Sequence, residues 1–332
     1  MTNTPSDQVQ SFDIPNFTFT SGETLQSAKL CYLDINPQST KTALVITCFR
    51  GRLASTLNFT DGALKDHRVI VAALFGNGES SSPSNSNFPS AVTYIDCVNA
   101  QKELLTSHLG LPSIDVVVGF SMGGQCAYHW SVMFPDFMQN TVIICSSART
   151  SRHNYQFLEG PKAALENAID YVDKSAATSS SGPSRGVRAF GKAYSAWLTS
   201  AEWFDQEQYK TSGYESLEAW DLDVTWKGYT GWEPDDLLVM LRMWQNGDIT
   251  KAGSAGDKSL EQSLSTIKSR TLLMPCQADQ YFRPDANQRE AMSIPNVTLA
   301  IIPSIWGHVA GGGANPVDTE WMDRTIAEFL QG

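Results

Sequence analysis

Basic residues, long apolar runs and cysteine are all scarce in this chain. Its 332 residues include 24 lysines and arginines against 35 aspartates and glutamates, a net charge of −11. Nucleic acids and anionic membranes bind clusters of basic residues, so we predict neither as a partner. No apolar stretch approaches the ~18 residues of a membrane-spanning helix. The first ten residues also lack the basic and apolar regions of a signal peptide, so we expect a cytoplasmic protein.

The six cysteines are too few and too scattered for a disulfide framework, and no two form a C-x-x-C pair. Cys48, Cys145 and Cys276 each end an apolar run, where cysteine usually acts as a small buried hydrophobic residue. A zinc site needs three or four converging ligands, which the sequence does not indicate. We expect no metal and no bound cofactor.

The chain does contain an alternation of strand-like and helix-like segments. Strands that are continuous apolar runs are typical of a parallel sheet covered on both faces, whose ligands gather at the carboxyl ends of the strands. We predict an α/β fold with a mostly parallel, doubly wound sheet built from residues 1–150 and 266–332. The predicted strands are Ala43–Cys48, Arg68–Leu74, Val116–Val118, Thr141–Cys145, Thr271–Cys276 and Val297–Ile302, and the predicted helices are Ala91–Leu109, Gln125–Phe134 and Thr319–Leu330.

Residues 151–265 interrupt this alternation, because they contain helical spacing and many aromatic residues but no buried-strand run. Both ends of the segment lie at predicted core strands, which favours an inserted helical lid over an independent domain. A Ser/Gly/Pro-rich stretch, Ser175–Gly186, separates the first two helices. The predicted lid helices are Leu158–Asp173, Val187–Thr199, Tyr209–Ala219 and Pro234–Gln245.

The most informative segment is Val-Val-Val-Gly-Phe-Ser-Met-Gly-Gly at residues 116–124. A strand that turns sharply into a helix at a serine presents that hydroxyl at the carboxyl end of the sheet. Gly119 and Gly123 lack a Cβ, which lets the strained turn close. The pattern predicts a nucleophile elbow at Ser121; the alternative is an ordinary strand-to-helix turn with an N-cap serine.

A serine nucleophile needs a base, usually histidine, and the chain has five histidines. His129 lies eight residues into the elbow helix, about 12 Å along its axis, and cannot reach back. His67 precedes a strand and belongs to the opposite edge, while His108 ends a helix. His153 and His308 both follow strands, and the chain order of nucleophile, acid, histidine favours His308.

The acid is expected in the loop after the preceding strand, where Asp279 is the first carboxylate. Asp285 comes six residues later, at the start of the next helix, where an acidic residue caps. Ser121, Asp279 and His308 then form an ordered catalytic triad.

Other residues beside this edge are candidates for binding substrate. The backbone N–H groups of Met122 and Phe49 are expected to form the oxyanion hole. Arg50 and Arg149 are candidates to bind a substrate carboxylate bidentately, and His153 is a candidate to face the substrate.

With these residues in place, the chain resembles the homoserine O-acetyltransferase-like group of α/β-hydrolases. The resemblance implies a Ser/His/Asp triad at Ser121, His308 and Asp279. It also implies an acyl-enzyme mechanism, a helical lid and a homodimer formed through the lid. The segments that carry it are Gly119–Gln125, the helix with Ile95-Asp96 and Leu104-Leu105, Ser147-Ala148-Arg149, Asp279-Gln280-Tyr281-Phe282 and Gly307-His308.

Two segments depart from that group. Homoserine acetyltransferases carry His-Ala-Leu-Thr-Gly after the early strand, where this chain has Thr47–Gly51, and Gly-Ser-Thr-Gly-Pro where it has Gly76–Pro83. The resemblance therefore supports serine acyl chemistry but not homoserine as the acceptor. Glu79 and the Ser80–Ser86 run are expected to form a solvated loop.

The leading functional hypothesis is an enzyme that hydrolyses an ester, thioester or lactone of a small metabolite. The alternative is an O-acyltransferase, with acyl-CoA as a possible co-substrate. A lyase that uses the same triad stays open, because a fold does not fix a reaction. A non-catalytic binding protein is the alternative of another class. The glycine spacing does not match a dinucleotide-binding motif.

Overall fold

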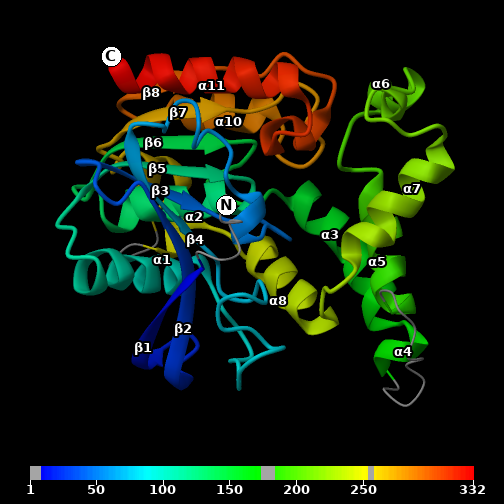
Figure 1. Ribbon diagram of the computed structural model, residues 1–332, viewed down its shortest axis with the longest axis horizontal. Coiled ribbons are helices and arrows are strands. Elements are labelled where there is room, and N and C mark those ends of the chain that lie inside the picture. Colours follow the sequence, from blue (N-terminus) through cyan, green and yellow to red (C-terminus); the bar gives the residue numbers. More distant parts are fainter. Residues whose placement is uncertain (1–8, 173–183, 253–257) are drawn as a thin grey trace, which may run out of the picture.

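The computed structural model describes residues 9–172, 184–252 and 258–332, and these form an eight-stranded sheet with helices on both faces (Figure 1). The strands are β1 (Gln10–Thr18), β2 (Thr24–Ile35), β3 (Lys41–Ile46), β4 (His67–Ala72), β5 (Ile114–Phe120), β6 (Met138–Ile144), β7 (Arg270–Met274) and β8 (Val297–Leu299). Their order is β1-β2-β4-β3-β5-β6-β7-β8, and β3 to β8 pair in parallel. This confirms the predicted parallel core.

The first two strands were not predicted from the sequence. β1 and β2 form an antiparallel pair at one edge, and β2 joins the sheet antiparallel to β4. β1 buries only Ile14 and Phe17, so polar residues interrupt its apolar pattern. The rule for continuous apolar runs finds buried central strands and misses an edge strand of this kind.

Alternate residues of β5 show why both faces of the sheet are covered. Val117 packs in the cluster that includes residues of α1 (Tyr94–Glu103) and α2 (Met122–Met133). Val116 and Val118 pack on the opposite face with Met322 and Ile326 of α11 (Pro316–Gln331). Helix α10 (Pro284–Ala291) connects β7 to β8. The sheet is therefore doubly wound, as predicted.

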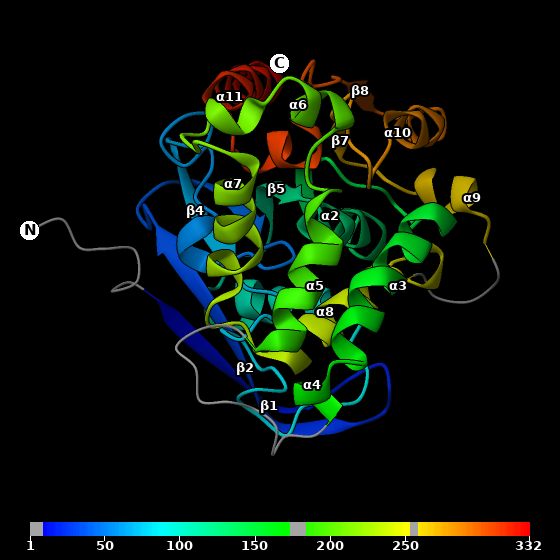
Figure 2. The same cartoon turned by 90° about the vertical axis from the view of Figure 1, so that its right-hand side faces the viewer.

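Seven helices lie between β6 and β7 in the described part of the chain, and α3, α5 and α7 pack side by side (Figure 2). Residues 173–183, which include most of the predicted Ser/Gly/Pro-rich stretch and the last residue of the predicted helix before it, lie outside the described residues. Among the described helices, none has the length and apolar character needed to cross a membrane. The seven are α3 (Arg152–Glu166), α4 (Ile169–Val172), α5 (Arg185–Ser195), α6 (Ala201–Asp205), α7 (Leu217–Thr225), α8 (Pro234–Gln245) and α9 (Leu260–Leu264).

The predicted helix over Tyr209–Ala219 was wrong. A 3-10 turn covers Gln208–Lys210, and Gly213 then adopts a left-handed conformation with φ of 86°. Such a residue ends a helical segment, and α7 begins only at Leu217 after the cap of Ser216. A π-helical segment covers Leu104–His108, and further 3-10 segments cover Leu53–Ser55, Lys227–Tyr229, Ile249–Lys251 and Gly307–Gly312.

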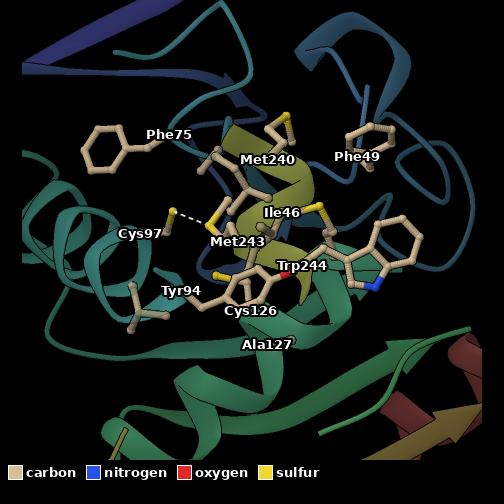
Figure 3. Close-up of a cluster of buried hydrophobic side chains, with 14 of the residues drawn as sticks. Ile46, Phe49, Phe75, Tyr94, Cys97, Cys126, Ala127, Met240, Met243 and Trp244 are labelled. Atoms are coloured by element: carbon tan, nitrogen blue, oxygen red, sulfur yellow. Dashed lines mark hydrogen bonds between the residues drawn. The ribbon is translucent and has the colours of Figure 1, made fainter. Parts of the chain in front are cut away.

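Helix α8 packs into the main hydrophobic core, although it belongs to the segment between β6 and β7. Met243 projects from α8 toward Cys97 of α1, and Met240 and Trp244 of α8 belong to the same cluster of buried side chains as Cys126 of α2 (Figure 3). The Sγ atom of Cys97 lies 3.8 Å from the Sδ atom of Met243. The start and end of this helix match the predicted Pro234–Gln245 segment, and its apolar face explains why the pattern was clear.

The solvated loop expected at residues 79–86 was wrong for its first part, because Ser80, Ser81 and Ser82 are buried, whereas Ser84 is exposed. Ser80 and Ser82 are fully buried, and the Ser80 hydroxyl accepts a hydrogen bond from the Cys31 N–H at 3.0 Å. The Glu79 carboxylate accepts one from the Leu53 N–H at 3.0 Å. A serine hydroxyl here accepts a hydrogen bond from a backbone N–H group that has no backbone partner at this place. Composition alone does not reveal this use of serine.

Candidate active site

The turn between β5 and α2 carries Ser121 in a strained conformation, with φ of 56° and ψ of −122°. Positive φ is uncommon for residues other than glycine, and such strain clusters at functional sites. The turn closes because Gly119 and Gly123 are small: a Cβ on Gly119 would overlap the Gly123 carbonyl, and one on Gly123 would lie 2.5 Å from the Ile46 carbonyl oxygen. The Ser121 side chain makes no capping bond to α2. This geometry is that of an elbow and not of an ordinary N-cap.

The structure brings Ser121, His308 and Asp279 into one hydrogen-bonded chain. The Oγ atom of Ser121 lies 2.8 Å from Nε2 of His308, and Nδ1 of His308 lies 2.7 Å from Oδ2 of Asp279. The second oxygen of Asp279 accepts hydrogen bonds from the backbone N–H groups of Tyr281 and Phe282. All three side chains are buried.

These contacts fix the role of each ring nitrogen of His308. The Asp279 carboxylate is an acceptor only, so Nδ1 carries the hydrogen that faces it. The neutral ring then presents Nε2 as an acceptor for the Ser121 hydroxyl. The ring is held from three sides, with the aromatic rings of Phe120, Tyr281 and Phe282 centred 4.8, 4.7 and 5.6 Å away.

A cavity of about 270 Å³ opens at this chain and is lined by Phe49, Ser121 and His308 together with other residues. Within the described residues, the backbone N–H groups of Phe49 and Met122 donate no hydrogen bond to the protein. Met122 is the first residue of α2, where the helix dipole places partial positive charge. Two free donors beside a serine are the arrangement that a developing oxyanion requires.

The Phe49 ring fixes the loop that carries one of these donors. It packs against Phe190, Tyr194 and Trp244, with ring centres 6.1, 5.5 and 5.9 Å away. Phe49 and Trp244 are both visible in Figure 3. The contact ties the loop after β3 to helices α5 and α8.

Arg50 also lines this cavity and adopts φ of 57°. Its guanidinium group lies 3.7 Å from the centre of the Tyr229 ring and donates a hydrogen bond to the Gly228 carbonyl. Arg50 therefore connects the loop after β3 to the turn after α7. Of the two predicted arginines, it is the one that the structure brings to Ser121.

Arg149 and His153 do not line the Ser121 cavity. Arg149 is exposed and lines a separate cavity of about 520 Å³ with Arg152 and Arg289. His153 is exposed on α3, its ring 5.4 Å from that of Trp197. The chain leaves β6 at the correct edge, but neither Arg149, in the loop before α3, nor His153, on α3, reaches the cavity at Ser121.

Sequence reasoning missed several residues that line the cavity, among them Tyr194, Leu198 and Val309. Val309 directly follows His308, so its place beside the candidate base could have been inferred from the sequence. Tyr194 and Leu198 come from α5 and the turn that follows it. Only the packing of the insertion against the sheet places them there, and no local pattern could have found them.

Comparison with known proteins now identifies the family. Residues 45–181 match the family model described as alpha/beta hydrolase fold. An ethyl acetate hydrolase from Pseudomonas veronii is 31% identical over 307 residues, which are 89% of this chain and 87% of that protein. The chain belongs to the α/β-hydrolase family.

Two further relatives show the range of this family around the chain. The solved structure of the acetyl esterase MekB matches with a TM-score of 0.89 and 27% identity, covering 98% of this chain and 97% of that one. A homoserine O-acetyltransferase from Haemophilus influenzae is 28% identical over 282 residues, 77% of this chain and 72% of that protein. The resemblance seen in the sequence is thus confirmed, and the protein is an α/β-hydrolase enzyme of the class that contains esterases and acyltransferases.

Proposed function

We propose that this α/β-hydrolase cleaves small carboxylic esters, with Ser121 as the nucleophile, His308 as the base and Asp279 as the group that orients the base. The observation that carries the proposal is the hydrogen-bonded chain from Ser121 to Asp279 at a cavity with two free backbone donors. Relatives named as an ethyl acetate hydrolase and an acetyl esterase favour acetyl esters as the substrate class. Thioesters and lactones share the same carbonyl chemistry.

In the first half of the reaction, the Ser121 Oγ atom bonds to the ester carbonyl carbon while its proton passes to Nε2 of His308. The negative charge that forms on the carbonyl oxygen accepts hydrogen bonds from the N–H groups of Phe49 and Met122. Asp279 stabilises the charged imidazole ring. The ester C–O bond then breaks, and the alcohol leaves with the proton held by His308.

In the second half, a water molecule gives a proton to His308 and its oxygen attacks the acyl carbon. The bond to Ser121 breaks, Ser121 recovers its proton and the carboxylic acid leaves. The cavity of about 270 Å³ at Ser121 has room for a small acyl group. No metal or cofactor enters either half of this scheme.

Replacement of Ser121 by alanine tests the nucleophile directly. Ser121→Ala is expected to abolish labelling by a fluorophosphonate probe and turnover of p-nitrophenyl acetate, because no other hydroxyl occupies this position. Ser131→Ala is a matched control, since Ser131 is a buried serine on α2, the helix that follows Ser121, and does not line the cavity. Labelling that persists in a folded Ser121→Ala protein contradicts the proposal.

Acyl transfer is the second candidate, and similarity to homoserine acyltransferases supports it. In that case an alcohol replaces water in the second half of the reaction, and acyl-CoA is a possible donor. Acetyl-CoA or a simple acetyl ester should be supplied with and without homoserine and related alcohols. Hydrolysis predicts free acetate without an acceptor, whereas acyl product formed only with an acceptor establishes a transferase.

The proposal includes the cellular setting expected from the sequence. It places the enzyme in the cytoplasm, as a homodimer formed through the helices between β6 and β7, acting on a small-molecule acyl substrate. The shortage of basic clusters supports the absence of a nucleic-acid partner. Sedimentation of the purified protein measures the oligomeric state.

A further inference from the structure

Helix α10 carries a buried carboxyl group that the reaction scheme does not use. Glu290 is 5% exposed, and its carboxylate accepts three hydrogen bonds. The donors are the Tyr128 hydroxyl at 2.7 Å, the Asn287 amide at 2.7 Å and the Ala148 backbone N–H at 2.9 Å. These donors come from α2, from α10 itself and from the loop after β6. One side chain therefore joins three parts of the fold.

A chain of hydrogen bonds leads from this carboxylate to the nucleophile. The Asn287 amide uses its second hydrogen to reach the Ser146 carbonyl at 2.8 Å, and the Ser146 hydroxyl donates to the Ser121 carbonyl at 2.7 Å. Ser146 also packs closely on α2, because a Cβ on Gly124 would lie 2.5 Å from the Ser146 Cβ. The strained backbone of Ser121 thus rests on a loop that Glu290 and Asn287 hold.

The charge state of Glu290 matters to these bonds. In the geometry seen, all three partners donate, which the carboxylate form satisfies. Protonation keeps every contact only if the new hydrogen meets the Tyr128 oxygen and the Tyr128 hydroxyl turns its own hydrogen away, so the bond from Tyr128 is the one that protonation changes. Burial raises the pKa of Glu290 to about 7, while its hydrogen bonds and Arg289 act to lower that pKa. The other charged groups on this side line the cavity of about 520 Å³ next to it: Arg149, Arg152 and Glu261.

We propose that Glu290 is a positioning residue for Ser121, which acts through Asn287 and Ser146 to hold the loop that supports the nucleophile turn. The inference rests on the proposed role of Ser121. It assigns no contact with substrate to Glu290. Its consequence is that protonation of Glu290 loosens the elbow and lowers the rate of attack by Ser121.

The main test replaces Glu290 by glutamine. This keeps the size of the side chain but puts an NH₂ group, which cannot accept a hydrogen bond, in place of one carboxylate oxygen. For p-nitrophenyl acetate we expect kcat to fall roughly 10- to 100-fold with KM nearly unchanged, because a small displacement of a reacting group costs this much. The rate of inactivation by a fluorophosphonate is expected to fall in parallel. Asp285→Asn is the matched control, an equal loss of charge on the exposed side of α10, and should leave both rates unchanged.

The shape of the pH profile separates positioning from simple stabilisation. In Tyr128→Phe the carboxylate loses one donor, so the pKa of Glu290 rises and the acid limb of kcat moves to higher pH. In Glu290→Gln the contribution of this group to the acid limb disappears. Ser146→Ala keeps the carboxylate network but cuts its link to Ser121, and should lower kcat at all pH values. A purely structural role lowers the melting temperature and leaves every profile with the wild-type shape.

The outcomes distinguish this inference from the proposed function. Absence of fluorophosphonate labelling in the wild-type enzyme overturns the role of Ser121 and this inference with it. A labelled wild type together with variants of unchanged kcat and pH profile overturns the inference alone. If Glu290→Gln does not fold, Tyr128→Phe and Ser146→Ala still decide the matter, because each removes a single hydrogen bond.

Discussion

At the scale of single residues, the proposed triad makes Asp279 the group that determines whether His308 can act as a base. One carboxylate oxygen faces His308 and the other accepts two backbone N–H groups, so the orientation of the side chain is fixed. An asparagine here would keep the two backbone bonds and turn its NH₂ group toward the ring. The ring would then carry its hydrogen on Nε2, facing Ser121.

We therefore expect Asp279→Asn to fold normally and to lose roughly 10³- to 10⁴-fold in kcat, as the wrong tautomer does in other serine enzymes. Steady-state kinetics and a thermal melt measure the two properties separately. Asp285→Asn serves as control, since Asp285 was the rejected candidate for the acid. Loss of activity in Asp285→Asn but not in Asp279→Asn would exchange the two assignments.

The sequence predicts residues well where chemistry, chain order and a strand end coincide. Ser121, Asp279 and His308 each follow a strand, and the structure brings them together. Arg149 follows a strand as well, but its direction depends on how α3 leaves the loop, which sequence spacing does not determine. Glu290 reads as an ordinary helix residue in the sequence. Its role depends on three partners that converge only in the folded chain.

At the scale of elements, the helices between β6 and β7 differ in how firmly they join the core. Helix α8 packs among the core side chains and is also attached at its first turn. Asp236 is buried and accepts hydrogen bonds from the Ser84 N–H at 3.0 Å and from the Ser84 hydroxyl at 2.6 Å. A helix bound in this way is part of the core.

Asp236→Ala is expected to reduce the free energy of unfolding by about 1–3 kcal/mol, because two hydrogen bonds from Ser84 to a buried carboxyl group are lost. Asp235→Ala is the control on the same turn, since Asp235 is exposed and, among the described residues, accepts a hydrogen bond only from the Tyr171 hydroxyl. Urea unfolding monitored by tryptophan fluorescence measures both. Equal effects of the two substitutions would show that the attachment of α8 does not depend on Asp236.

Helices and strands whose apolar residues recur with a clear period were predictable, and those with a weak apolar period were not. Helix α8 and the parallel strands follow clear apolar patterns. The edge strand β1 exposes most of its residues, and the segment before α7 is broken by the left-handed Gly213. In both places tertiary contacts decide the structure, so local propensity is a weak guide.

At the scale of the whole molecule, two buried groups give the stability opposite dependences on pH. Burial raises the pKa of Glu290 from 4.5 to about 7, so its contribution to stability is lost as the pH rises across that interval. Burial lowers the pKa of His129 from 6.5 to about 4, so its contribution is lost as the pH falls across that interval. Between about 4.5 and 6.5 the two effects oppose each other.

Glu290→Gln removes one side of this balance. We expect its free energy of unfolding to fall more steeply than that of the wild type as the pH is lowered from 6.5 to 4.5, because the His129 contribution then acts alone. Urea unfolding at a series of pH values gives the two slopes. Parallel curves for the two proteins would show that Glu290 does not titrate in this interval.

The backbone of Ser121 carries a conflict between two kinds of selection. Its angles of φ 56° and ψ −122° suit glycine, and holding another residue in such a conformation costs about 1–3 kcal/mol. Replacement of Ser121 by glycine would relieve this strain and remove the hydroxyl group. Homologues that have lost the reaction but kept the fold are therefore expected to carry glycine at position 121, whereas active homologues are expected to keep serine there.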